Sequence, residues 1–219
     1  MTTLHYPGVE KAPLSGLQLM KALLTNRITP GPSWKLPRYR LKFLFRTLKQ
    51  PRRTFALLDY LAQHPQRDEI LLAMPGLPAK LHRTYQAANI NQAQALKRIT
   101  DHYDMIQDCL PDAINHGYLN KKPMAIATLT GKEDQRYAIT FNAVSRLDKE
   151  GEATLSFNNQ QGEPIAIVTF SFIEYQGQPT LFIGALQGPR AHVDHQEIQT
   201  ATKACHGLFP KRLVIEALT

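Results

Sequence analysis

The chain has 219 residues, of which 43% are hydrophobic, and a formal net charge of +8. This is long enough to bury a core in one domain, or in one domain with a helical prefix. No run reaches the ~18 apolar residues of a membrane-spanning helix, and two cysteines exclude a disulfide framework. The N-terminus, MTTLHYPGVEKAPLSG, lacks the basic start and apolar run of a signal peptide, so we expect a cytoplasmic protein.

The positive charge is concentrated near the N-terminus. Residues 1–53 contain eleven Lys and Arg side chains and one acidic side chain, Glu10, which gives them a net charge of +10. The rest of the chain has 15 basic and 17 acidic side chains, a net charge of −2. This asymmetry indicates an anionic partner for the first segment, either membrane lipid or nucleic acid.

Apolar residues recur at helical spacing up to about residue 120. Ser15 is a candidate N-cap for the first helix, and Pro51 stands at a plausible first helical position. We therefore expect residues 1–120 to form a helical, basic N-terminal region. The predicted helices in this region include residues 15–26, 34–50, 51–64 and 91–110.

The predicted helix over residues 34–50 is the strongest interaction signal. Its apolar face comprises Leu41, Leu44, Phe45 and Leu48. Its other face comprises Arg38, Lys42, Arg46 and Lys49. The basic side chains could meet an anionic bilayer, with Phe45 and Trp34 at the lipid interface. We expect the apolar face to pack on the body of the protein, even if the charges also meet an anion. Nucleic acid is disfavoured because interleaved aromatics and helix-turn-helix spacing are absent.

After residue 120 the apolar period changes to two, which predicts strands. The segments between them have hairpin length, so we expect a largely antiparallel meander. A helix follows over residues 194–207, with Asp194 as its cap and Gly207 as its C-terminal stop. A last strand over residues 211–218 would complete a strand–helix–strand crossover between parallel strands. The meander strands are predicted over residues 122–131, 135–145, 152–160, 163–174 and 179–188.

The predicted fold class is α+β. It combines a helical N-terminal half with a mainly antiparallel meander sheet that includes one strand–helix–strand crossover. We expect the sheet domain, residues 121–219, to form one structural unit with the helical region.

Residues 181–190, LFIGALQGPR, run from a strand into a glycine turn before a helix. Backbone N–H groups and the helix dipole at such a turn can hold a phosphate. Because Pro189 removes one N–H donor and short glycine motifs are common, a simple tight turn is the favoured alternative. The candidate phosphate contacts are Gly184, Gln187, Gly188, Arg190 and Lys203.

Two side chains are candidates for catalysis. Glu152, at a strand end, could act as a general base, but such acids are more often solvated turn residues or paired with a neighbour such as Arg146 or Lys149. His206 is the second candidate. Its simpler role is to end the helix, where a donor or a cation meets the unpaired carbonyl groups of the last turn. The histidines over residues 192–206 lack ligand spacing, so we expect no metal site.

Several segments together resemble the VirK/YbjX family of bacterial proteins. They are RTYQ, DHYD, DKEGEATLSF, VTFSF, LFIGALQGP and TKACHGLFPKRLVIEAL, in this order. The sharpest parts are residues 150–152, 183–189 and 202–211. The resemblance implies a role in virulence, envelope integrity and tolerance of antimicrobial peptides, and it transfers no catalytic residue. Family members continue with a further helix, strand and basic tail, so the chain resembles a C-terminally truncated member whose last strand is an open edge.

A second, weaker similarity concerns residues 181–218, which resemble the acyl-CoA-binding part of the GCN5-related acetyltransferase fold. It implies acyl-CoA as cofactor and an N- or O-acyltransferase activity. The alternative is a non-enzymatic envelope accessory protein, peripheral at the inner membrane and acting from the cytosol. The expected partners are an anionic membrane surface or envelope components, a small-molecule acyl donor, and a second copy paired through the open strand edge.

Overall fold

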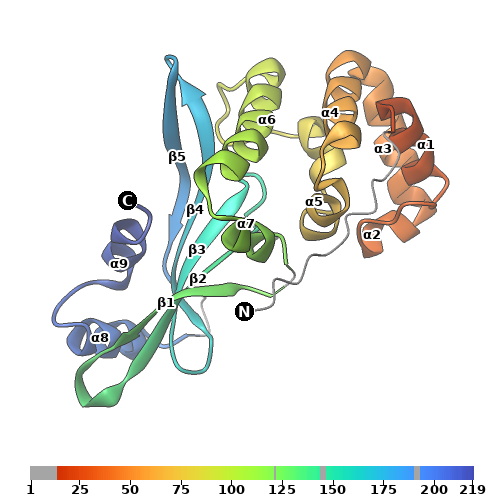
Figure 1. Cartoon of the computed structure of the whole chain (residues 1–219). Coiled ribbons are helices and arrows are strands. Elements are labelled where there is room, and N and C mark those ends of the chain that lie inside the picture. Colours follow the sequence, from red (N-terminus) through yellow and green to blue (C-terminus); the bar gives the residue numbers. More distant parts are fainter. Residues whose placement is uncertain (1–13, 121, 144–146, 190–192) are drawn as a thin grey trace, which may run out of the picture.

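Helices occupy the first half of the chain, as the apolar spacing predicts (Figure 1). The computed structural model describes residues 14–120, 122–143, 147–189 and 193–219. Ser15 caps the first helix: its hydroxyl accepts from the N–H of Gln18, whose side chain accepts from the N–H of Ser15. The helical segments are α1 (Gly16–Leu24), α2 (Pro32–Lys35), α3 (Pro37–Lys49), α4 (Pro51–Gln63), α5 (Arg67–Ala73), the short 3-10 helix η1 (Leu77–His82), α6 (Gln92–Cys109) and α7 (Asp112–Tyr118).

Trp34, in α2, anchors the chain just before α3 to the body of the protein. Its indole N–H donates to the carbonyl of Pro75 at 2.6 Å, and its side chain is fully buried. The rings of Tyr39 and Phe43 meet the indole edge-on, with centroids 5.0 and 5.1 Å away. The expectation that Trp34 sits at a lipid interface is therefore wrong.

The second half is a five-stranded meander in the order β1-β2-β3-β4-β5, with every neighbouring pair antiparallel. This confirms the predicted α+β class and the five predicted meander strands. All residues of the central strand β3 are buried, so both of its faces are covered. The strands are β1 (Met124–Thr130), β2 (Arg136–Ala143), β3 (Ala153–Asn158), β4 (Pro164–Tyr175) and β5 (Gln178–Gln187); a short 3-10 turn, η2 (Lys132–Asp134), links β1 and β2.

The predicted strand over residues 211–218 is wrong, because this segment forms helix α9 (Pro210–Glu216). Pro210 stands in its first turn, where a missing N–H leaves no bond unmade. Leu213 and Val214 are buried. Within the described residues the sheet contains no parallel pair, so the predicted crossover does not form and the edges of the sheet are β1 and β5.

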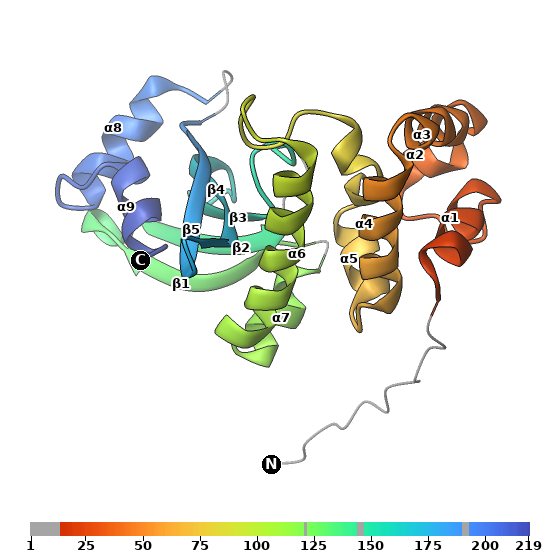
Figure 2. The same ribbon diagram turned by 90° about the horizontal axis from the view of Figure 1, so that it is seen from above.

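Helices cover both sides of the sheet. Helix α6 packs along β4, and α9 packs on β3 and β4; Figures 1 and 2 show these two helices on opposite sides, with α1 to α5 stacked outside α6. Helix α8 (His195–Ala204) forms as predicted, capped by Asp194 and followed by Gly207 at φ +86°. The buried apolar side chains form one cluster that extends from Leu19 to Val214, so both halves share a core.

Candidate anion-binding site

Helix α3 packs through a different row of side chains from the one predicted. Phe43 and Thr47 are buried, and Leu44 is half-buried. The expectation that the apolar face packs on the body is wrong for three of its four members, which we call the apolar stripe. These are Leu41, Phe45 and Leu48, whose side chains are 53%, 63% and 64% exposed.

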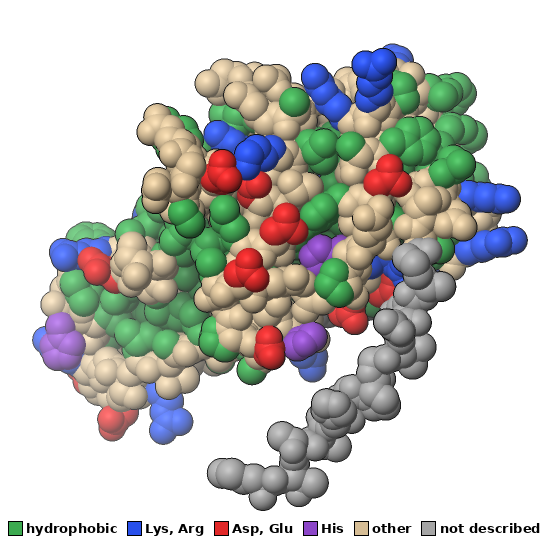
Figure 3. Space-filling model, turned by 45° about the horizontal axis from the view of Figure 1, so that its top comes forward, with side chains coloured by type: hydrophobic (Ala, Val, Ile, Leu, Met, Phe, Trp, Pro, Cys, Tyr) green, Lys and Arg blue, Asp and Glu red, His purple; other side chains and the backbone are tan. Residues whose placement is uncertain are grey.

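Four basic side chains lie beside this stripe. The basic stripe consists of Arg38, Lys42, Arg46 and Lys49, all of them exposed. A period of 3.6 residues places it next to the apolar stripe on the solvent side of α3. Residues 14–53 contain no Asp or Glu. Figure 3 shows apolar and basic side chains close together over the helical end of the molecule.

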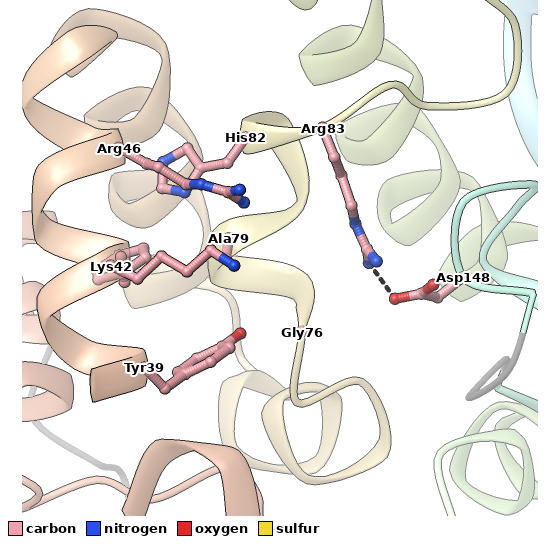
Figure 4. A pocket seen from close by; sticks show the side chains of 9 residues that line it. Tyr39, Lys42, Arg46, Gly76, Ala79, His82, Arg83 and Asp148 are labelled. Carbon is pink, nitrogen blue, oxygen red and sulfur yellow. Dashed lines mark hydrogen bonds and ion pairs between the residues drawn. The ribbon is translucent and has the colours of Figure 1, made fainter. Parts of the chain in front are cut away.

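A pocket of about 190 Å³ opens between α3, η1 and the segment before β3 (Figure 4). At ~30 Å³ for each water molecule, it holds roughly six waters. This is less than the ~300 Å³ at which pockets for larger organic ligands begin, so the space suits a small group. We call it the basic pocket. Its polar lining includes Tyr39, Lys42, Arg46, His82, Arg83 and Asp148.

Positive charge prevails in the basic pocket. The guanidinium of Arg83 forms an ion pair with the carboxylate of Asp148 (Figure 4). Among the described residues, Lys42 and Arg46 have neither an ion-pair nor a hydrogen-bond partner. Three cations therefore face one carboxylate, which leaves a formal charge of +2. Burial raises the pKa of Tyr39, so its hydroxyl remains a donor at neutral pH.

His82 lines the same pocket as a neutral ring. Burial, with a further contribution from Arg46, lowers its pKa to about 4. The hydroxyl of Thr54 lies 3.0 Å from the carbonyl of Gln50, to which it donates, so the His82 Nε2–H donates to Thr54 at 3.2 Å. Its Nδ1 atom is buried and has no hydrogen-bond partner in the described structure.

The sequence predicted Lys42 and Arg46 as anion contacts but not Arg83 or Asp148, which complete the pocket. Arg83 and Asp148 come from segments 65 positions apart, and no local spacing connects them. Both lie within segments that carry the family resemblance, RTYQ and DKEGEATLSF. Those segments were the available signal.

Glu152 lies in a sealed cluster between the two halves of the fold, which we call the Glu152 cluster. Its carboxylate pairs with the ammonium of Lys80, and their side chains are 0% and 1% exposed. The hydroxyl of Tyr103 donates to the other carboxylate oxygen at 3.0 Å, and Tyr118 donates to the Glu152 carbonyl at 2.9 Å. Burial lowers the pKa of Lys80, against the attraction of Glu152. Glu152 is thus not a solvated turn residue, and its ion-pair partner is the distant Lys80 and not Lys149; Arg146 lies outside the described residues.

A hydrogen-bonded chain extends the Glu152 cluster to β4 through His102. The backbone N–H of Phe172 donates to Nδ1 of His102 at 3.1 Å, so Nδ1 carries no proton. Nε2–H then donates to the hydroxyl of Tyr118 at 2.9 Å. This arrangement requires a neutral imidazole, and complete burial lowers the pKa of His102 to about 3.

Acid should destabilise the protein well above the range where carboxylates titrate. The unfolded His102 takes up a proton near pH 6.5, whereas the folded residue does so only near pH 3. Between these values the unfolded state binds more protons, so the free energy of unfolding decreases as the pH is lowered. From pH 7 to pH 5, His102 alone should lower the free energy of unfolding by about 2 kcal/mol. Urea unfolding across this range measures the slope. His102→Gln should be less stable at pH 7 but show a shallower slope; equal slopes would contradict the assignment.

The residues predicted to hold a phosphate after β5 do not converge on one site. A Cβ atom on Gly184 would collide with the backbone of the segment before β3. Gln187 and Gly188 line a pocket of about 420 Å³ on the sheet, whereas Lys203 lines a different one. Arg190 lies outside the described residues.

The two candidate catalytic residues also lie in separate environments. Glu152 is sealed in the core, whereas His206 is exposed just beyond the end of α8, at φ +55°. No cluster of three or more potential metal ligands occurs among the residues that the structure describes. In the same parts of the chain, no helix is both long enough and apolar enough to span a bilayer.

Comparison with known proteins defines the family. The model described as "Protein of unknown function (DUF535)" matches residues 32–219. The chain therefore belongs to this family, the VirK/YbjX family of the predicted resemblance. No solved structure matches it.

Two curated proteins are similar in sequence. The chain is 42% identical over 204 residues to the uncharacterized protein YbjX of Escherichia coli K12, an alignment that covers 93% of this chain and 62% of YbjX. It is 23% identical over 132 residues to an uncharacterized protein of Haemophilus influenzae KW20, covering 60% of this chain and 43% of that protein. The chain thus spans less than two thirds of either relative.

Proposed function

We propose that this protein is an accessory protein of the bacterial envelope that acts from the cytosolic side by binding anionic membrane lipid through α3. The observation that carries the proposal is the exposed apolar stripe beside the basic stripe. Its role would lie in envelope integrity or tolerance of antimicrobial peptides. The alternative acyltransferase function has no such support, because the crossover on which it rested does not form.

The two stripes suit an interface between water and lipid. Leu41, Phe45 and Leu48 could enter the boundary between headgroups and acyl chains, where an amphipathic helix lies in the membrane plane. Each neighbouring Lys or Arg contributes about 1 kcal/mol near an anionic leaflet. Four basic side chains lie along α3. We therefore expect charge and apolar burial to contribute similar amounts to the free energy of membrane binding, and binding should need both.

Binding to vesicles tests this proposal. The protein should sediment with phosphatidylglycerol-containing vesicles at low salt, and the fraction bound should fall as salt rises. Replacing Arg38 and Lys49 with Gln should weaken binding about 30-fold, at about 1 kcal/mol for each charge. Replacing Phe45 and Leu48 with Ser should weaken it to a comparable degree and reduce the salt-resistant fraction.

The matched control removes two charges outside the helical half of the chain. Lys122→Gln with Lys132→Gln changes the net charge equally, but these exposed residues flank β1, and neither belongs to α3 or lines the basic pocket. This variant should bind vesicles like the original protein. Equal losses in both pairs, or no binding at low salt, would refute the proposal. Preferential binding to duplex DNA that persists without Phe45 and Leu48 would also refute it.

A further inference from the structure

The basic pocket gathers its donors from two elements of the fold. The ammonium of Lys42, the guanidinium of Arg46 and the hydroxyl of Tyr39 extend from α3, and Arg83 stands across the space from them (Figure 4). Arginine presents several N–H donors in a planar fork, which matches the oxygens of phosphate. The pocket therefore presents more donors and positive charge than its own carboxylate uses.

We propose that the basic pocket binds the phosphate group of a phosphomonoester. A phosphomonoester carries nearly two negative charges at neutral pH, which matches the formal +2 of the pocket, whereas a phosphodiester or a carboxylate carries one. The volume of about 190 Å³ is sufficient for a small tetrahedral group. The proposal rests on the proposed function only for the source of the phosphate.

Asp148 is the competing anion in this pocket. Its carboxylate holds the Arg83 guanidinium, and it would repel the charge of an incoming phosphate. Replacement by asparagine keeps the shape, frees Arg83 and raises the formal charge from +2 to +3. Asp148→Asn should thus bind phosphate more tightly. If the Arg83–Asp148 ion pair had only a structural role, its loss would not increase the affinity for phosphate.

A lipid headgroup is one source of the phosphate. Lys42 and Arg46 belong both to the basic stripe and to the wall of the pocket, so a headgroup beside α3 could reach it. A soluble phosphorylated metabolite is the other source. The two share the same chemistry, and the experiment separates them.

Calorimetric titration of the full chain with glycerol 3-phosphate tests the phosphate site. Arg83→Gln should weaken binding about tenfold or more, as expected for loss of a charge-assisted hydrogen bond. Ala79→Leu places a larger apolar side chain in the pocket wall without changing the charge, and it should weaken binding to a similar extent. Asp148→Asn should tighten binding about threefold or more. The control, Arg52→Gln, removes an exposed charge outside the pocket and should leave binding unchanged.

Thermal unfolding of each variant shows whether it is folded, and only folded variants are compared. Ala79→Leu binding as tightly as the original protein would overturn the proposal, because the charge alone would then suffice. Absence of binding in the original protein, or no gain in Asp148→Asn, would also overturn it. The charge-neutral and gain-of-binding variants together exclude non-specific attraction.

Vesicles identify the source. Phosphatidic acid presents a phosphomonoester and phosphatidylglycerol a phosphodiester, so vesicles matched in total charge should differ only at the pocket. A preference for phosphatidic acid that Ala79→Leu abolishes supports a headgroup; binding of glycerol 3-phosphate without that preference supports a soluble ligand. Binding to phosphatidylglycerol vesicles, without a preference for phosphatidic acid and without binding of glycerol 3-phosphate, would refute the phosphate site but support the proposed function of α3. Binding of glycerol 3-phosphate without binding to any vesicle would support the phosphate site but refute the proposed function.

Discussion

Replacing Glu152 with glutamine should lower the free energy of unfolding by about 3–5 kcal/mol, because it leaves the charge of Lys80 buried without its carboxylate. The two side chains are almost fully inaccessible, so water cannot replace the lost partner. Lys80→Met should have a similar effect, since the buried carboxylate would keep the hydroxyl of Tyr103 as a donor but lose its cation. Urea unfolding with a linear extrapolation measures both changes.

The double variant, Lys80→Met with Glu152→Gln, distinguishes a coupled pair from two separate defects. Once neither side chain is charged, the loss should be smaller than the sum of the single losses by 1 kcal/mol or more, roughly the coupling seen between contacting groups. The control is Lys97→Met, which removes an exposed ammonium that pairs with Asp101 and Glu174 and should cost less than about 1 kcal/mol. Additive single effects would contradict the assignment of the Glu152 cluster as a closed unit.

The local features of the fold could be predicted because their causes are local. The capping box at Ser15, the proline at the start of α4 and the aspartate cap of α8 each involve residues a few positions apart. The alternation of β1 to β5 and the short turns between them likewise determine the meander. The family resemblance could also be predicted, because it depends on the order of several segments, and the family match over residues 32–219 confirmed it.

Two local predictions failed for identifiable reasons. Residues 211–218 contain two adjacent β-branched side chains, and a short apolar run of this kind cannot be assigned by period alone; Pro210 was the overlooked helix start. On α3, two apolar rows compete for the core. Trp34, which packs against Phe43, decides between them, and that contact depends on the tertiary arrangement around Pro75.

The candidate site was only half predictable. The basic stripe is a property of one helix and could be read directly from the spacing of its charges. The partners that turn it into a pocket, and the pairing of Lys80 with Glu152, join positions 65 and 72 residues apart. Charge and composition do not reveal such long-range pairings. For this reason the sequence pattern favoured a surface position for Glu152, whose carboxylate lies in the core.

Replacing Gly184 with alanine should lower the free energy of unfolding by about 3 kcal/mol, the upper range for overpacking. Gly184 lies in β5 at a bulge opposite Thr169 and Phe170, and the carbonyl oxygen of Glu150 would lie only 1.7 Å from the new Cβ atom. That neighbour is backbone, so relieving the collision requires movement of β5 or of the segment that leads into the Glu152 cluster.

Gly188→Ala, directly after the end of β5, is the matched control. Its Cβ atom would have its nearest neighbour at 3.7 Å, on the flexible Lys211 side chain, so the change should be within about 0.5 kcal/mol. In thermal unfolding, Gly184→Ala should lower the melting temperature by about 6–12 °C and Gly188→Ala by less than about 2 °C. Equal effects would contradict the packing role of Gly184. The predicted difference would instead show that Gly184 lets two parts of the chain pack closely, because the Glu150 backbone occupies the space that a side chain would need.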